Sequence, residues 1–161
     1  TSRGLGRAGG ALAGQNLGAG HAERAKSSIG WAIIYSAGMS LIAMTLFITV
    51  PEQIAAFFSD SPEFIAHTST WILILAFATF PMSSVQVFTQ GISSTGATVA
   101  PMFITLVTMW LIEVPIAMAL AYYTPLDSAG VPWGIVIGNV LRSAAFFVYF
   151  ARGTWLKTGM I

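Results

Sequence analysis

The sequence predicts an all-α integral membrane protein with four transmembrane helices, and three observations lead to this fold class. Hydrophobic residues make up 55% of the chain and charged residues only 8%, against about 25% charged in soluble domains. Four apolar stretches are each long enough to cross a bilayer as a helix. Six of the seven Lys and Arg residues fall on one side of these stretches, because basic loops stay in the cytoplasm during insertion. A large soluble core with four buried helices is the alternative, which is disfavoured by four apolar runs of more than 20 residues with polar residues gathered between them.

An acidic loop joins the first two stretches. Residues 28–50 contain no charged side chain, and Pro51 ends this stretch. Residues 51–63 form a loop that carries acidic side chains and no Lys or Arg. The second stretch, 64–89, contains Pro81. Both stretches have the length of a membrane-spanning helix.

A short turn joins the last two stretches, and a neutral Gly/Ser/Thr loop precedes them. A short turn makes consecutive helices antiparallel neighbours. The ranges are 90–100 for the loop, 101–122 for the third stretch, 123–129 for the turn and 130–150 for the fourth.

The charge bias also predicts the topology. With four spans both ends lie on one side, and the basic residues assign that side to the cytoplasm of a bacterial inner (plasma) membrane. Residues 1–27 are then the end of a preceding helix plus a cytoplasmic loop, 28–150 the membrane part, and 151–161 a cytoplasmic tail. Because residues 1–27 lack the apolar core of a signal peptide, we expect the chain to be a fragment of a longer protein.

Composition excludes several functions. The net charge is +1, and no basic stripe of the kind that binds nucleic acid is present. The chain has no Cys, and His21 and His67 lie far apart, so we expect neither a metal site nor a cofactor. No nucleophile and base occur in a catalytic pattern, so we expect no enzyme activity.

Two charged residues lie inside the predicted spans. Glu113 lies about 18 Å from the cytoplasmic end of its helix and Arg142 about 12 Å from the same side, at 1.5 Å per residue. A charge at such depth is expensive and faces the bundle interior or a wet cavity. Glu113 is therefore either a site for the coupling cation or proton, or one half of an ion pair with Arg142. A paired Glu113 is the poorer proton carrier.

Prolines and polar side chains mark a second candidate region. Pro81 and Pro115 each remove a backbone hydrogen bond inside a span, which gives either a packing kink or a broken helix of the kind that forms transporter sites. Residues at spacings of three and four share a helical face, and this face is either a helix contact or a cavity lining. Its members are Ser83, Gln86 and Gln90, and adaptable methionines nearby, Met82 and Met109, are further candidates for a lining.

Four segments together resemble the C-terminal part of a multidrug and toxic compound extrusion (MATE) transporter, over nearly the whole chain. The match depends on their order, spacing and loop sidedness. The segments are GQNLGAGHAERA (14–25), PEQIAAFFSDSPEFIAHTSTWI (51–72), QGISSTGATVAPM (90–102), and the pair GVPWGIVIGNVL (130–141) and YFARGTWLK (149–157).

The resemblance implies twelve helices in two six-helix lobes, and export of drugs or small organic cations driven by inward flow of Na⁺ or H⁺. This chain would supply helices nine to twelve and the end of helix eight, so that the partners would be the lipid bilayer and an N-terminal lobe of the same chain. An oligosaccharide-lipid flippase of the same architecture and a non-transporting membrane assembly subunit are the rivals. A flippase would line its cavity with Arg or Lys, and only Arg142 is available in a predicted span.

The chain departs from the family pattern at two places. The third segment usually carries Arg and Asp, whereas here it is neutral. Some branches of the family hold a cation-site carboxylate in helix ten beside a Val-Gln-Val run, and this chain has Ser83 before that run. Coupling would then depend on Glu113 or on the N-terminal lobe.

Overall fold

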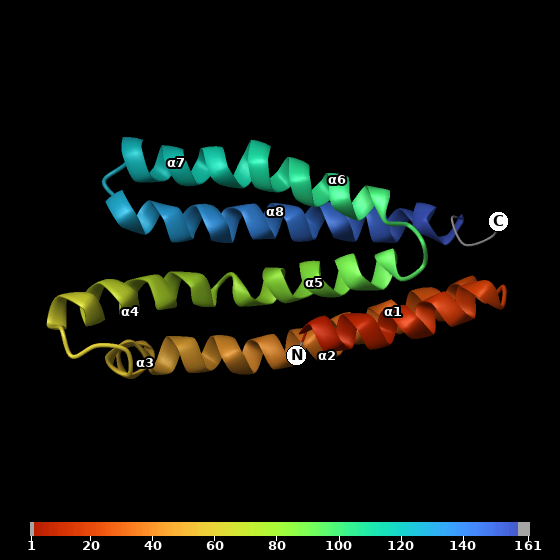
Figure 1. Ribbon diagram of the computed structural model, residues 1–161, viewed down its shortest axis with the longest axis horizontal. Helices are drawn as coiled ribbons and strands as arrows, with labels where there is room; N and C mark the ends of the chain where they lie inside the picture. Colours follow the sequence, from red (N-terminus) through yellow and green to blue (C-terminus); the bar gives the residue numbers. More distant parts are fainter. Residues whose placement is uncertain (1, 158–161) are drawn as a thin grey trace.

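The computed structural model describes residues 2–157, and every regular element in this range is a helix (Figure 1). The long helices lie side by side along the molecule in the order α6–α7, α8, α4–α5 and α2, and α1 packs against α2 and α5. The elements are α1 (Ser2–Gly18), α2 (Ala22–Thr49), α3 (Pro51–Ala56), α4 (Pro62–Ala76), α5 (Thr79–Ser93), α6 (Val99–Val107), the π-helical η1 (Thr108–Glu113), α7 (Val114–Tyr123), the 3₁₀ turn η2 (Asp127–Ala129), α8 (Gly130–Arg152) and the 3₁₀ turn η3 (Thr154–Lys157).

Three helices are long and apolar enough to cross a membrane, and a bent pair supplies a fourth span if it is counted as one. The three are Ala22–Thr49, Val99–Tyr123 and Asp127–Arg152. Many large apolar side chains on them point outward, among them Ile42, Leu111 and Phe147. Exposed apolar surface on this scale is typical of a bundle that faces lipid.

The predicted second span, 64–89, is divided into α4 and α5, which meet at an angle of 53°. Pro81 has no amide hydrogen, so the carbonyl of Phe77, one turn earlier, receives no helical hydrogen bond from it. At the same place the helix tightens, because the amides of Phe77 and Ala78 bond to the carbonyls of Ile74 and Leu75, only three residues back, at 3.2 and 2.9 Å. The bend therefore lies one turn before Pro81.

The third span remains continuous but contains a π-helical segment. The Val114 amide bonds to the Met109 carbonyl, five residues earlier, and Pro115 lies in the first turn of α7. A π-helical turn and a bend are two ways to accommodate an interior proline. Pro115 is accommodated by the π-helical turn that precedes it, without a bend of the helix.

Most of the segment 1–27 is helical. The amides of Ala19, Gly20 and His21 close the C-terminus of α1 by bonding to carbonyls three to five residues back, and the chain then enters α2. The packing is close: a Cβ built on Gly9 would lie 2.7 Å from the Ala32 Cβ. Because α1 folds back along α2, residues at its start do not lie at the end of the bundle.

Glycines spaced by four bring α8 against α7 and η1. A Cβ on Gly134 would overlap the Cα of Ala117, and a Cβ on Gly138 would lie 2.6 Å from the Cβ of Glu113. Small residues at this spacing let membrane helices approach closely. The approach brings the charged residues of the two spans within reach of each other.

Candidate functional site

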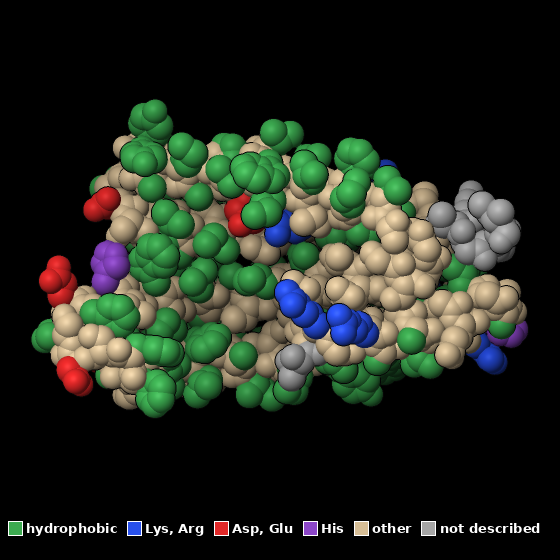
Figure 2. All heavy atoms as spheres, in the orientation of Figure 1, with side chains coloured by type: hydrophobic (Ala, Val, Ile, Leu, Met, Phe, Trp, Pro, Cys, Tyr) green, Lys and Arg blue, Asp and Glu red, His purple; other side chains and the backbone are tan. Residues whose placement is uncertain are grey.

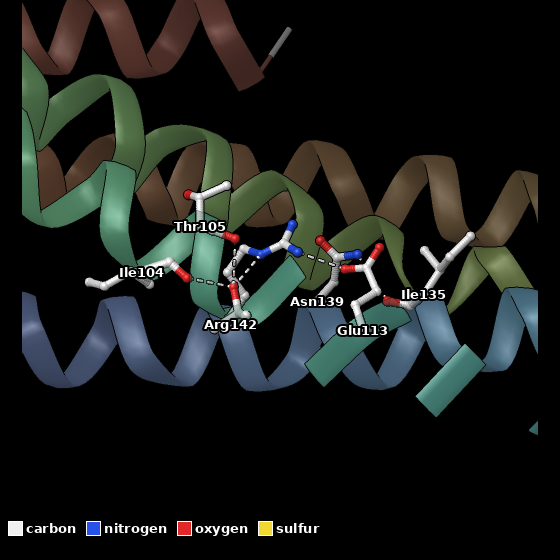
Figure 3. A network of polar contacts seen from close by, with 7 residues as sticks. Ile104, Thr105, Glu113, Ile135, Asn139 and Arg142 are labelled. Atoms are coloured by element: carbon white, nitrogen blue, oxygen red, sulfur yellow. Dashed lines mark hydrogen bonds and ion pairs between the residues drawn. The ribbon is translucent and has the colours of Figure 1, made fainter. Parts of the chain in front are cut away.

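The structure brings Glu113 and Arg142 together (Figure 3). Arg142 Nη2 donates a hydrogen bond to Glu113 Oε2 at 2.7 Å, and the two side chains are only 10% and 16% exposed. Glu113 is the last residue of η1, and Arg142 lies in the middle of α8. The pair is therefore an ion pair inside the apolar part of the bundle, as a charge at membrane depth requires.

Arg142 also contacts the other end of the π-helical segment. Its Nε donates a hydrogen bond of 2.8 Å to Thr108 Oγ1, and the Thr108 hydroxyl donates in turn to the Ile104 carbonyl at 2.6 Å. Thr108 begins η1 and Glu113 ends it. One side chain of α8 thus holds both ends of the widened turn.

Two neighbours of the pair were missed by sequence reasoning. Gly138 leaves the space that the Glu113 side chain occupies, because a Cβ there would lie 2.7 Å from Glu113 Oε2. Asn139 is buried beside the pair and donates from Nδ2 to the Ile135 carbonyl at 2.9 Å (Figure 3). The spacing of Gly130, Gly134 and Gly138 was the available signal for this contact.

The polar face of α5 divides between two roles. Ser83 and Gln86 line a cavity of about 280 Å³, together with Met82 and side chains of α1 and α2. Gln90 instead lies in the helix contact, since a Cβ on Gly6 of α1 would be 3.0 Å from the Gln90 Cβ. The face is thus a cavity lining at one end and a helix contact at the other.

The structure does not bring Met109 to this cavity. Met109 lines a separate hollow of about 430 Å³, which is formed by α6, the start of η1 and the end of α5, and in which Met102 and Trp110 also take part. Met82 and Met109 are both partly exposed. The two methionines therefore belong to different surfaces.

The structure also contains a larger apolar groove. It lies between α2, α5 and α8, measures about 930 Å³, and includes Met44, Pro81 and Phe88. Helix α5 contributes to both hollows, but different residues of it line the groove and the smaller cavity. Among residues 2–157, no group of three or more His, Cys, Asp or Glu side chains could hold a metal ion.

We expect Gln86→Leu to change the drug profile of the full-length protein more than its expression. The substitution removes the amide from the cavity wall while it keeps a side chain of similar size, so the fold should tolerate it. Resistance of cells to a panel of drugs, compared with the amount of protein in the membrane, is the measurement. Thr89→Val, at the separate hollow, is the control, and an unchanged resistance spectrum for Gln86→Leu would count against the cavity.

The apolar helices and the ion pair buried among them define a multi-pass helical membrane protein. A model of the MatE family matches residues 2–119, which is well over half of the chain. The chain therefore belongs to the MatE family, a family of transporters and not of enzymes.

Named relatives agree with this assignment. The chain is 23% identical over 150 residues to the probable multidrug resistance protein NorM of Thermotoga maritima, which covers 93% of this chain and 32% of that protein. It is 30% identical over 144 residues to multidrug resistance protein PmpM of Pseudomonas aeruginosa, and this match covers 86% of this chain and 30% of that protein. It is 26% identical over 140 residues to protein DETOXIFICATION 41 of Arabidopsis thaliana, a match that covers 86% of this chain and 27% of that protein. The chain thus spans about a third of the length of these relatives.

Proposed function

We propose that the chain is part of a cation-coupled multidrug efflux antiporter that works by alternating access. Membership of the MatE family and relatives named as multidrug resistance proteins support drug efflux. We assign the coupling step to the Glu113 carboxylate within the membrane part of the bundle, and because Arg142 holds it at 2.7 Å, an incoming ion has to compete with the arginine for the carboxylate. An intramembrane carboxylate is the group to which Na⁺ or H⁺ binds in such transporters.

The coupling would act through η1. When a proton or Na⁺ binds Glu113, the attraction of the carboxylate for Arg142 weakens, and Arg142 keeps only its bond to Thr108 at the far end of the π-helical segment. The ion then stabilises the packing of η1 against α8 in which the Glu113 carboxylate is not bonded to Arg142. A ligand shifts an equilibrium only by its differential affinity for two states, and release of one end of η1 supplies such a difference.

The protein would lie in the bacterial inner membrane, with the connection between α1 and α2 and the C-terminal tail on the cytoplasmic side and the rest of the transporter supplied by an N-terminal lobe. Its substrates would be small organic compounds. The family resemblance favours organic cations as substrates. A cation would need an acidic partner, and Glu113, the acidic side chain at membrane depth among the described residues, is already paired with Arg142.

Glu113→Gln tests the coupling. In proteoliposomes of the full-length transporter, we expect the variant to lose ion-driven drug uptake by at least about tenfold, the effect of removing one charge-assisted interaction. Exchange of drug for drug, which needs no ion, should persist and reports that the protein is folded. Glu52→Gln, at the exposed start of α3, is the matched control. Full ion-driven uptake by Glu113→Gln would overturn the assignment.

A further inference from the structure

A histidine joins the first half of α4 to the turn between α7 and α8. The His67 Nε2 atom and the Ser128 hydroxyl form a hydrogen bond of 3.0 Å between residues that are 61 positions apart in the sequence. Ser128 belongs to η2, where the amide of Ala129 bonds to the carbonyl of Leu126 at 3.0 Å. The contact therefore attaches α4 to a turn that has its own internal hydrogen bond.

The hydrogen bond lies at a hollow of about 430 Å³, whose walls include Glu63 and His67 of α4 and Asp127 and Ser128 of η2. The hollow is at the end of the bundle opposite the connection between α1 and α2, and Figure 2 shows acidic side chains gathered at that end, where α3, α4 and α7 end. The His67 side chain is exposed. Protons from the surrounding water can therefore reach it.

Two carboxylates are the other charged groups of this hollow within the part of the chain that the structure describes. Glu63 comes from α4 and Asp127 from η2. The elements around α4 and η2 carry further titratable side chains at this end or at mid-depth, namely Tyr35, Glu52, Asp60, Tyr122, Tyr123 and Arg142. None of these lines the hollow. A proton on His67 would thus act first on Glu63, Asp127 and Ser128.

Protonation of the imidazole strengthens this contact. Histidine is the side chain whose charge ordinarily changes between about pH 5 and pH 8. In the neutral form either the ring or the serine hydroxyl donates, whereas in the protonated form Nε2–H donates to Ser128 Oγ, and charge-assisted hydrogen bonds are about twice as strong as neutral ones. The positive ring also offsets the repulsion between Glu63 and Asp127, which lie on the two elements that the contact joins. The attachment is therefore stronger in acid and weakens as the pH rises and the proton leaves.

The bend in the second span lets the attachment of α4 affect the rest of the bundle. His67 lies ten residues before Phe77, at the bend, which is about 15 Å along the helix axis. Nearer the bend, α4 packs on α8 through a small apolar cluster that includes Val136. Beyond the bend, α5 lines the small cavity with Ser83 and Gln86. A change at His67 can thus pivot α4 at its junction with the helix that lines the cavity.

We propose that His67, with Glu63, Asp127 and Ser128, forms a proton-binding site at the outer end of the bundle, and that the occupied site holds α4 against the turn between α7 and α8. The ligand is a proton from the outside solution, which adds to the imidazole while no other covalent bond is made or broken. The site is separate from Glu113 and controls the position of α4. Its effect on transport rests on the proposed transport function, whereas the attachment itself does not.

The test measures the distance between α4 and the end of α7 in the full-length protein, in detergent micelles. Spin labels on Phe64→Cys and Tyr123→Cys, both at exposed positions, report this distance by double electron–electron resonance in a background without other cysteines. We expect the ratio of the attached to the detached population to be about fivefold higher at about pH 5 than at about pH 8, the difference between a charge-assisted and a neutral hydrogen bond.

Three substitutions assign the response to the histidine. His67→Gln keeps a side chain that forms hydrogen bonds but takes up no proton in this range, so its attached population should be the same at both pH values. Ser128→Ala removes the acceptor and should remove most of the response. His21→Gln changes the other histidine of the chain, which lies in the connection between α1 and α2, and this control should keep the full response.

Three results would overturn the inference: a response that survives in His67→Gln, a distance that does not depend on pH, or a larger attached population at the higher pH. Ion-driven drug uptake into proteoliposomes is measured in parallel, for the parent protein and for His67→Gln, at both outside pH values. A His67-dependent distance in a protein that shows no uptake at either pH would support the proton site and reject the transport function.

Discussion

Arg142→Ala is expected to lower the free energy of unfolding of the full-length protein by about 3 kcal/mol, the low end of the range for breaking a buried ion pair. The low end applies because the two side chains keep 10% and 16% of their exposure. Removal of the guanidinium leaves Glu113 without its ionic partner among the described residues, and it also removes the donor to Thr108. Folded yield in detergent and the midpoint of thermal unfolding are the measurements.

A double-mutant cycle separates the pair from its surroundings. Glu113→Gln/Arg142→Ala removes both charges, so the uncompensated carboxylate disappears and part of the lost stability should return. Arg152→Ala, at the exposed end of the same helix, is the control and should change stability by no more than about 0.5 kcal/mol. Losses at Glu113 and Arg142 that simply add would show that the pair contributes no coupling energy.

Gly134→Ala is expected to have the second large effect, about 3 kcal/mol, the upper part of the range for overpacked cores. The added methyl group would overlap the backbone of Ala117 in α7, and backbone cannot move aside as a flexible side chain can. The helices α7 and α8 would have to separate, which also draws Glu113 away from Arg142. The midpoint of thermal unfolding and the rate of ion-driven uptake should therefore both decrease.

Gly38→Ala provides the matched control for that substitution. Gly38 lies in α2, and a Cβ there would meet nothing within 4 Å. The same chemical change should then be neutral or stabilise the helix by up to about 1 kcal/mol, because alanine is the better helix former. Equal destabilisation by Gly38→Ala and Gly134→Ala would refute close packing of α7 on α8 as the cause.

Much of the arrangement around the ion pair follows from the sequence. Apolar length predicted the helices that hold Glu113 and Arg142, and the short turn between them made the helices antiparallel neighbours. Counting residues from the span ends placed the two charges about one helical turn apart in depth, within the reach of an arginine. The observed distance of 2.7 Å is compatible with that arithmetic.

Other features depend on contacts that a single sequence does not display. Two interior prolines have the same local effect on hydrogen bonding, yet Pro81 follows a 53° bend and Pro115 follows a π-helical turn. Arg142 bonds at both ends of that turn, and these contacts come from another helix. The depth of Ser2 was likewise hidden, because its position before the first span in the sequence suggested the end of the bundle, whereas it shares a cavity with Met39 and Ser40 of α2.

The π-helical segment shifts the phase of everything beyond it. A turn closed by hydrogen bonds five residues apart holds about one residue more than a regular turn, which is a rotation of about 100° around the axis. A helical wheel drawn over Val99–Tyr123 as one regular helix therefore misassigns faces after Glu113. Residues of α6 and of α7 that fall on one stripe of such a wheel therefore point in different directions. Scanning mutagenesis of this span should be read as two separate periodic patterns, one up to Val107 and one from Val114.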